Sequence, residues 1–176
     1  MKNPLRFVIE AIAERNPMYL SHHPACKYYD HHTFTLYDQQ LCMGCFVVYP
    51  VGFVSLLTIS LFWIFRPDSV IFHPETHHLH IIGMSFASPM IANKIIFKQS
   101  RKRMRILMKA CLGVGLGIMV FPLLSRPSDR LFTLAVLLLF LIPYIGYKGV
   151  TALDDCKGCP EKEDFPNCSG FEFKKE

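Results

Sequence analysis

The sequence predicts an all-α membrane protein, with four transmembrane helices, an N-terminal interfacial amphipathic helix and a cysteine-rich cytoplasmic cap. Three observations predict this class. Hydrophobic residues make up 51% of the 176 residues. Most of them fall in four long apolar segments, and basic residues gather in one connecting loop. The net charge of +5 is concentrated in that loop, so we expect a single membrane domain over residues 1–176 and no nucleic-acid partner.

The first expected element is a helix over residues 4–15. Asn3 and Pro4 are typical of a helix N-cap and first turn, and the Asn16–Pro17 pair ends the pattern. Its length is too short to cross a bilayer, which needs about 20 apolar residues. We therefore expect the helix to lie along the membrane surface, or else to pack on the protein's own cap. The apolar residues that recur at helical spacing are Leu5, Val8, Ile9 and Ile12.

Four apolar segments are predicted to cross the membrane: residues 46–65, 79–97, 106–124 and 131–147. The second is the least apolar because it contains His80, Pro89 and Asn93. Such residues are tolerated in a span where neighbouring helices satisfy the backbone. Glycines at 113, 115 and 117 in the third segment allow a partner helix to approach closely.

The connecting loops predict the orientation. Basic residues crowd the loop between the second and third spans, at Lys98, Arg101, Lys102, Arg103 and Arg105. The positive-inside rule places this loop in the cytoplasm, and four spans place both termini there too. We expect the lipid bilayer and other membrane subunits as partners. Binding of anionic lipid headgroups is an alternative role for the loop.

Two Cys-x-Gly-Cys motifs flank the membrane segments, one within the loop 16–45 and one within the tail 148–176. Disulfides are rare in a reducing cytosol, whereas the two-residue spacing lets both sulfurs of a pair bind one ion. Four thiolates suit zinc or an iron–sulfur cluster. We predict a zinc ion bound by Cys42, Cys45, Cys156 and Cys159.

Further ligands are available on the same face of the membrane. Cys26 and Cys168, with His22 or His23, could complete a second site or substitute into the first. Cys159 is followed by proline, as in ferredoxin-type motifs, but their tight run of three cysteines is absent. An iron–sulfur cluster and redox-active dithiols stay open as alternatives.

A second group of histidines lies on the opposite side of the membrane. His73, His77 and His80 are spaced i, i+4, i+7, so they share a helix face and could hold a divalent metal. The pattern His73-x-x-x-His77-His78 is also similar to a histidine box of membrane desaturases and hydroxylases. This resemblance implies a metal oxygenase. A complete span separates these residues from the N-terminal histidines, which disfavours a shared di-iron site. Histidines that hydrate a helix end are the simpler interpretation.

The segment from Leu41 to Tyr49, together with Cys26, resembles a small prokaryotic membrane-protein family of unknown function. In that family a Cys-His pair precedes Cys-x-Arg-Cys-x-Gly-x-Tyr at the entrance to a membrane helix. Here Lys27, Gly44 and Val47 stand where the family has histidine, arginine and glycine. The resemblance covers roughly residues 20–125 and implies no activity.

The leading functional hypothesis is a structural or accessory membrane subunit whose cap is held together by zinc. The alternative is an electron-transfer or thiol-redox protein that uses the same cysteines. The four spans contain neither Asp nor Glu, which argues against a proton-coupled transporter.

Overall fold

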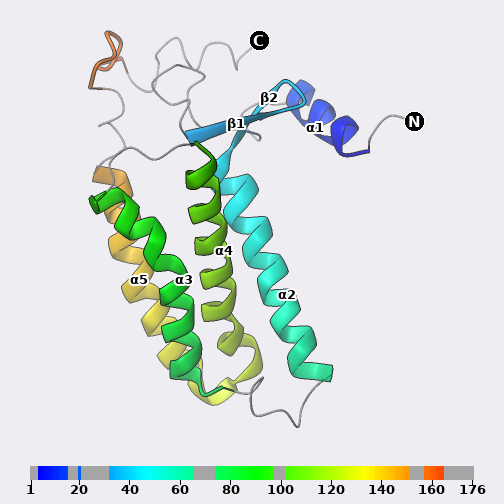
Figure 1. Ribbon diagram of the computed structural model, residues 1–176, viewed down its shortest axis with the longest axis vertical. Coiled ribbons are helices and arrows are strands. Elements are labelled where there is room, and N and C mark those ends of the chain that lie inside the picture. The colour runs from blue at the N-terminus through cyan, green and yellow to red at the C-terminus, as the bar shows by residue number, and fades with distance from the viewer. Residues whose placement is uncertain are drawn as a thin grey trace. The chain divides into compact units, whose positions relative to one another are not determined.

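The computed structural model describes residues 4–15, 20, 32–65, 74–96, 102–150 and 157–164. The chain is mostly helical, as predicted, with five α-helices and one β-hairpin in the described residues. It divides into two compact units, residues 1–46 with 147–176, and residues 47–146. Their elements are labelled in Figure 1.

In the first unit a short helix packs on a hairpin. Helix α1 (Pro4–Arg15) has the bounds predicted from its proline start and Asn–Pro end. Its Ile9 is buried against Leu20 and Leu41, while Phe7 on another face is 66% exposed. The guanidinium of Arg6 donates a 2.7 Å hydrogen bond to the Glu10 carboxylate, which raises the pKa of Arg6. One apolar face therefore meets protein, and further apolar side chains stay available to a membrane surface.

The hairpin is the first departure from the all-α prediction. Strand β1 (Thr33–Leu36) pairs antiparallel with β2 (Gln39–Cys42), so that Thr33 lies opposite Cys42. The turn residues Tyr37 and Asp38 have φ values of 52° and 63°. Positive φ at both positions is typical of a type I′ turn, which matches the twist of the two strands. Over the residues that the structure describes, the fold is therefore mainly α-helical with one small sheet.

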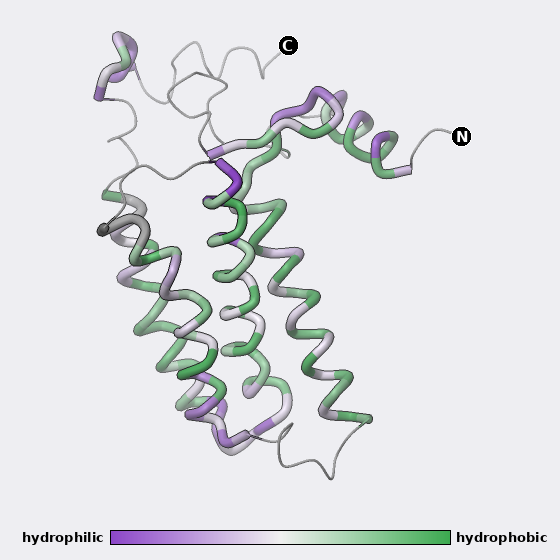
Figure 2. The backbone as a smooth tube through the Cα atoms, viewed as in Figure 1, coloured by the Kyte–Doolittle hydropathy of each residue, from purple (hydrophilic) through white to green (hydrophobic). Residues whose placement is uncertain are grey.

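The second unit is built from long apolar helices. They are α2 (Tyr49–Phe65), preceded by the π-helical turn η3 (Gly44–Val48), α3 (Thr76–Ile96), α4 (Lys102–Ser125) and α5 (Arg130–Val150). Within the described residues, three helical stretches are long and apolar enough to cross a membrane: Gly44–Phe65, Lys102–Ser125 and Pro127–Tyr147. Figure 2 shows hydrophobic residues along the helices and polar residues near their ends. These features indicate a membrane protein.

Helix α4 is the centre of this unit and lies between α2 and α3 (Figure 1). A Cβ atom built on Gly113 would lie 2.6 Å from the Val48 carbonyl oxygen, and one on Gly117 would lie 2.5 Å from the Gly52 carbonyl oxygen. Gly115 faces the other way, onto the backbone of Gly83 in α3. Alternate glycines therefore bring α4 against the backbones of two different helices, as small residues do in membrane bundles.

Side chains fill the rest of the bundle in two clusters. Near the end of α2, Trp63 packs edge-on against Phe121, with ring centroids 5.5 Å apart. Towards the other end of α4, Leu112 packs with Ala87 of α3, and Tyr144 of α5 covers this cluster. Helix α5 thus adds to the bundle through large side chains, whereas α4 meets α2 and α3 through its backbone.

The glycine contacts predict an asymmetric response to added methyl groups. We expect Gly115→Ala to lower the free energy of unfolding by about 1–3 kcal/mol, because the neighbouring atoms are backbone and cannot move aside easily. Gly146→Ala is the matched control, since a Cβ there meets nothing within 4 Å. Thermal unfolding of both variants in one detergent measures the difference. Equal midpoints would show that the close approach does not stabilise the bundle.

Candidate functional site

The first cysteine pair lies where the hairpin joins a helix. Cys42 is the last residue of β2, and its backbone N–H donates a 2.9 Å hydrogen bond to the Leu20 carbonyl. Cys45 follows in the first turn of η3. The Cys42 side chain is only 2% exposed, whereas that of Cys45 is half-buried. The strand end and the helical turn thus carry the two thiols on one short connection.

The second pair is described only at Cys159, which is half-buried and lies between two turns. The Lys162 backbone N–H donates a 3.3 Å hydrogen bond to the Cys159 carbonyl. Cys159 belongs to the same compact unit as Cys42 and Cys45. Neither these three cysteines nor Cys111 in α4 forms a disulfide within the described part of the chain.

Several predicted ligands fall outside the described residues, namely Cys26, Cys156, Cys168, His22, His23 and His73. The four-sulfur zinc site therefore stays a prediction.

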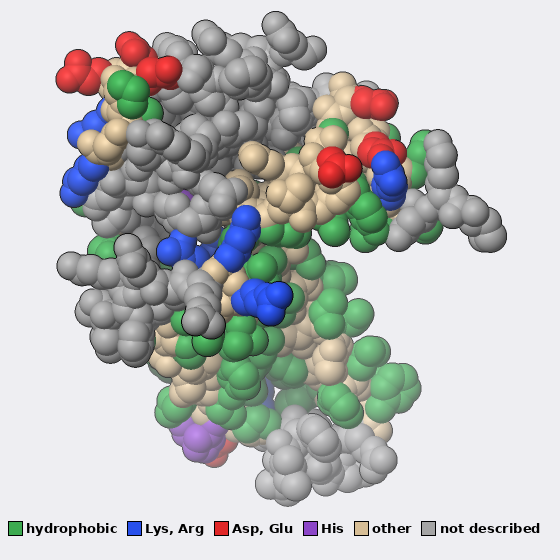
Figure 3. All heavy atoms as spheres, turned by 45° about the horizontal axis from the view of Figure 1, so that its top comes forward, with side chains coloured by type: hydrophobic (Ala, Val, Ile, Leu, Met, Phe, Trp, Pro, Cys, Tyr) green, Lys and Arg blue, Asp and Glu red, His purple; other side chains and the backbone are tan. Residues whose placement is uncertain are grey.

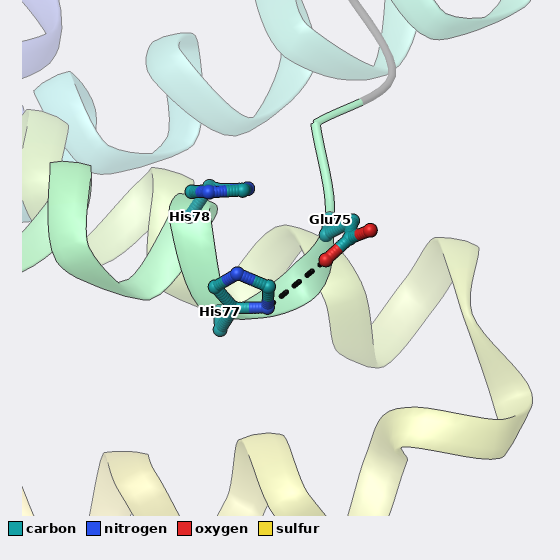
Figure 4. A group of neighbouring side chains, drawn as sticks. All are labelled: Glu75, His77 and His78. Carbon is teal, nitrogen blue, oxygen red and sulfur yellow. Dashed lines mark ion pairs between the residues drawn. The ribbon is translucent and has the colours of Figure 1, made fainter.

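A different group of metal-ligating side chains comes together at the start of α3. Ligand atoms of Glu75, His77 and His78 all lie within 4.8 Å of one another, and no other such group of three occurs in the described part of the chain. The Glu75 Oε2 atom is 3.3 Å from His77 Nδ1. A dashed line marks this pair in Figure 4. The His77 and His78 rings are tilted by 42° with centroids 4.1 Å apart. All three side chains are exposed.

This group shares only His77 with the predicted set of His73, His77 and His80. Helix α3 begins at Thr76, so the helical spacing does not extend back to His73. His80 is 4% exposed, and its Nδ1 lies 2.7 Å from the Thr76 carbonyl oxygen. Helical spacing gave no reason to include Glu75, which precedes the helix, whereas His78 was singled out only through the likeness to a histidine box.

The segment that carries this group is anchored by Arg126, at the end of α4. Its guanidinium donates hydrogen bonds to the Pro74 carbonyl and, at 2.9 Å, to the Thr76 hydroxyl. The Thr76 hydroxyl in turn donates to the Asp129 carboxylate. The Arg126 guanidinium carbon also lies 5.3 Å from the centre of the Trp63 ring. One arginine thus joins α2, the start of α3 and the α4–α5 connection through charge-assisted and cation–π contacts.

Two buried side-chain atoms of the bundle have no hydrogen-bond partner among the described residues. They are His80 Nε2 and Thr133 Oγ1. Phe132 packs edge-on against the His80 ring, with centroids 5.5 Å apart. The His80 Nδ1–H donates to the Thr76 carbonyl, since a carbonyl oxygen only accepts. Buried polar atoms of this kind are commonly satisfied by an internal water molecule.

No family model, no curated protein and no solved structure matches the chain. Its function is therefore inferred from the residues and geometry described above.

Proposed function

We propose that this protein is a four-span membrane protein whose cytoplasmic cap binds a zinc ion through paired cysteines, and that it acts as a structural or accessory subunit. The observation that carries the proposal is the placement of Cys42 and Cys45 together at the junction of β2 and η3. Cys159, from the second Cys-x-Gly-Cys motif, belongs to the same compact unit. Thiolates in a reducing compartment are preferred ligands for zinc.

Helix α3 is the proposed fourth span. At about 1.5 Å per residue, its 21 residues extend about 31 Å, close to the roughly 30 Å hydrocarbon core of a bilayer. Ser85 and Ser88, within the helix, donate hydrogen bonds to the carbonyls of Ile81 and Ser85 at 2.9 and 2.8 Å. Its polar hydroxyls are therefore satisfied internally, as a lipid environment requires. Apolar side chains such as Phe86 are exposed along the same helix.

Charge supports an orientation with both termini in the cytoplasm. Lys102, Arg103 and Arg105 lie in the first turn of α4, whereas the histidines of α3 lie at the other end of the helices (Figures 1 and 3). Hydrophobic side chains cover much of the helical surface between them (Figure 3). The positive-inside rule then places the start of α4, the hairpin and the C-terminal tail on the cytoplasmic side.

A metal clip has a physical role in this setting. Helices in lipid lack a strong hydrophobic drive to associate, so bonds between the chain's two ends would contribute directly to holding the cap. Bound zinc would join the segment before α2 to the segment after α5. The cap would then offer a rigid surface to another membrane subunit.

A thiol-redox protein is the second candidate. The exposures favour it, because Cys42 is buried while Cys45 is half-buried. A dithiol with one shielded and one accessible sulfur can present a single nucleophile to a substrate disulfide. Elemental analysis of the purified protein distinguishes this candidate from the zinc clip, because only the clip requires stoichiometric zinc. Visible absorbance that bleaches on reduction would identify an iron–sulfur cluster instead.

Replacement of Cys42 by serine tests the clip. We expect the wild-type protein to bind cobalt with an intense near-ultraviolet sulfur-to-cobalt band, which reports thiolate ligands only, and to contain zinc when purified gently. Cys42→Ser should abolish this band and release the zinc, because one of four ligands is lost. Cys111→Ser, a free cysteine within α4, is the matched control and should leave both unchanged. A wild-type protein without a sulfur-to-cobalt band would contradict the zinc clip.

Reporter fusions test the four spans and the orientation. Alkaline phosphatase, which is active only outside the cytoplasm, should be active when fused after Phe65 and inactive when fused after Lys102. A green fluorescent protein at the C-terminus should fluoresce. Phosphatase activity at both fusion points would show that α3 does not cross the membrane.

A further inference from the structure

We propose that Glu75, His77 and His78 form a second metal site, one that takes a divalent transition-metal ion of the zinc, cobalt or nickel class. The site is independent of the cysteines, because it lies in the other compact unit. It is also distinct from the histidine set that sequence spacing suggested, since His80 is buried and not part of it.

The distances fit tetrahedral coordination. A metal with bonds of about 2.0–2.2 Å to nitrogen and oxygen separates neighbouring ligand atoms by about 3.3–3.5 Å. The Glu75 Oε2 and His77 Nδ1 atoms are already 3.3 Å apart. The remaining ligand atom, from His78, lies within 4.8 Å of the other two ligand atoms. The His78 side chain is exposed, so a change of rotamer can bring this atom closer to them. Figure 4 shows the three side chains around one side of the helix start.

The set of side chains favours a metal ion over a simple ion pair. An ion pair between His77 and Glu75 would account for the 3.3 Å contact alone. It would not account for His78, whose ring centroid is 4.1 Å from that of His77. Two imidazoles and a carboxylate are a common ligand set for zinc. Mixed nitrogen and oxygen ligands also disfavour magnesium and calcium, which take oxygen.

The backbone that carries the ligands is held in place, although the ligands themselves are exposed. Arg126 binds the Pro74 carbonyl on one side of Glu75 and the Thr76 hydroxyl on the other. The Leu79 backbone N–H donates a 3.2 Å hydrogen bond to the Glu75 carbonyl, which fixes the first turn of α3. Ligands on such a rigid segment lose little backbone freedom when they bind.

Three protein ligands leave one tetrahedral position for water or for another molecule. Because all three side chains are exposed, this position faces solvent and an ion can exchange readily. The site would therefore bind a metal reversibly, unlike the closed four-sulfur site of the proposed cap.

Cobalt binding to the tag-free, full-length protein in detergent tests the site. We expect equilibrium dialysis to give about one equivalent of Co²⁺ fewer for the His77→Gln/His78→Gln double variant than for wild type. Weak visible bands without sulfur character should be lost from this variant, while any near-ultraviolet sulfur-to-cobalt band stays. Thr76→Val removes the hydroxyl bound by Arg126 and should weaken this cobalt affinity about tenfold or more.

His32→Gln and Glu14→Gln are the controls, since both replace residues of the other unit. They should keep the cobalt stoichiometry, and thermal unfolding confirms that each variant is folded. Unchanged cobalt binding by the folded double variant would overturn the site. Because the sulfur band is recorded in the same titration, this result is distinguishable from failure of the cysteine clip.

Discussion

The close approach of α4 to two neighbouring backbones is the constraint on which the helical unit depends. Lipid is as apolar as a leucine side chain, so helices in it gain most from close contact between their surfaces. Gly113 and Gly117 give α4 such contact with α2, and Gly115 gives it contact with α3. No side chain larger than hydrogen fits at these points without moving backbone. The positions of α2 and α3 follow from this one helix.

Arg126 shows how a charge is accommodated at the end of such a bundle. Its guanidinium is satisfied by a carbonyl, a hydroxyl and an aromatic ring, and the nearby Asp129 accepts from the same hydroxyl. The carbonyl and the hydroxyl belong to Pro74 and Thr76, so the arginine holds the segment at which α3 starts, while the aromatic ring belongs to α2. The geometry of the Glu75, His77 and His78 group therefore depends on contacts with Arg126, which is distant in the sequence, and not on the local helical repeat alone.

Sequence reasoning found the elements that depend on local composition. Apolar runs gave the long helices, and a proline start with an Asn–Pro end gave the bounds of α1. Residues 34–37 are compatible with a short strand, but the turn and the second strand were not predicted. The turn uses Tyr37 and Asp38 at positive φ, where asparagine and glycine are the usual signals. Of the candidate site, His77 was singled out by its spacing, and His78 by the likeness to a histidine box. Glu75 was not predicted, because it precedes the helix start, where Arg126 binds Thr76 from 50 residues away.

The order of the helices along the chain gives the glycine contacts a consequence for synthesis. Helices α2 and α3 leave the ribosome before α4 does, and α5 follows last. Until α4 has been synthesised, neither close backbone contact exists, because α4 supplies one side of each. Both contacts can therefore form only after this third helix is complete. A chain interrupted just before Lys102 would hold two helices with no backbone groove to receive either of them.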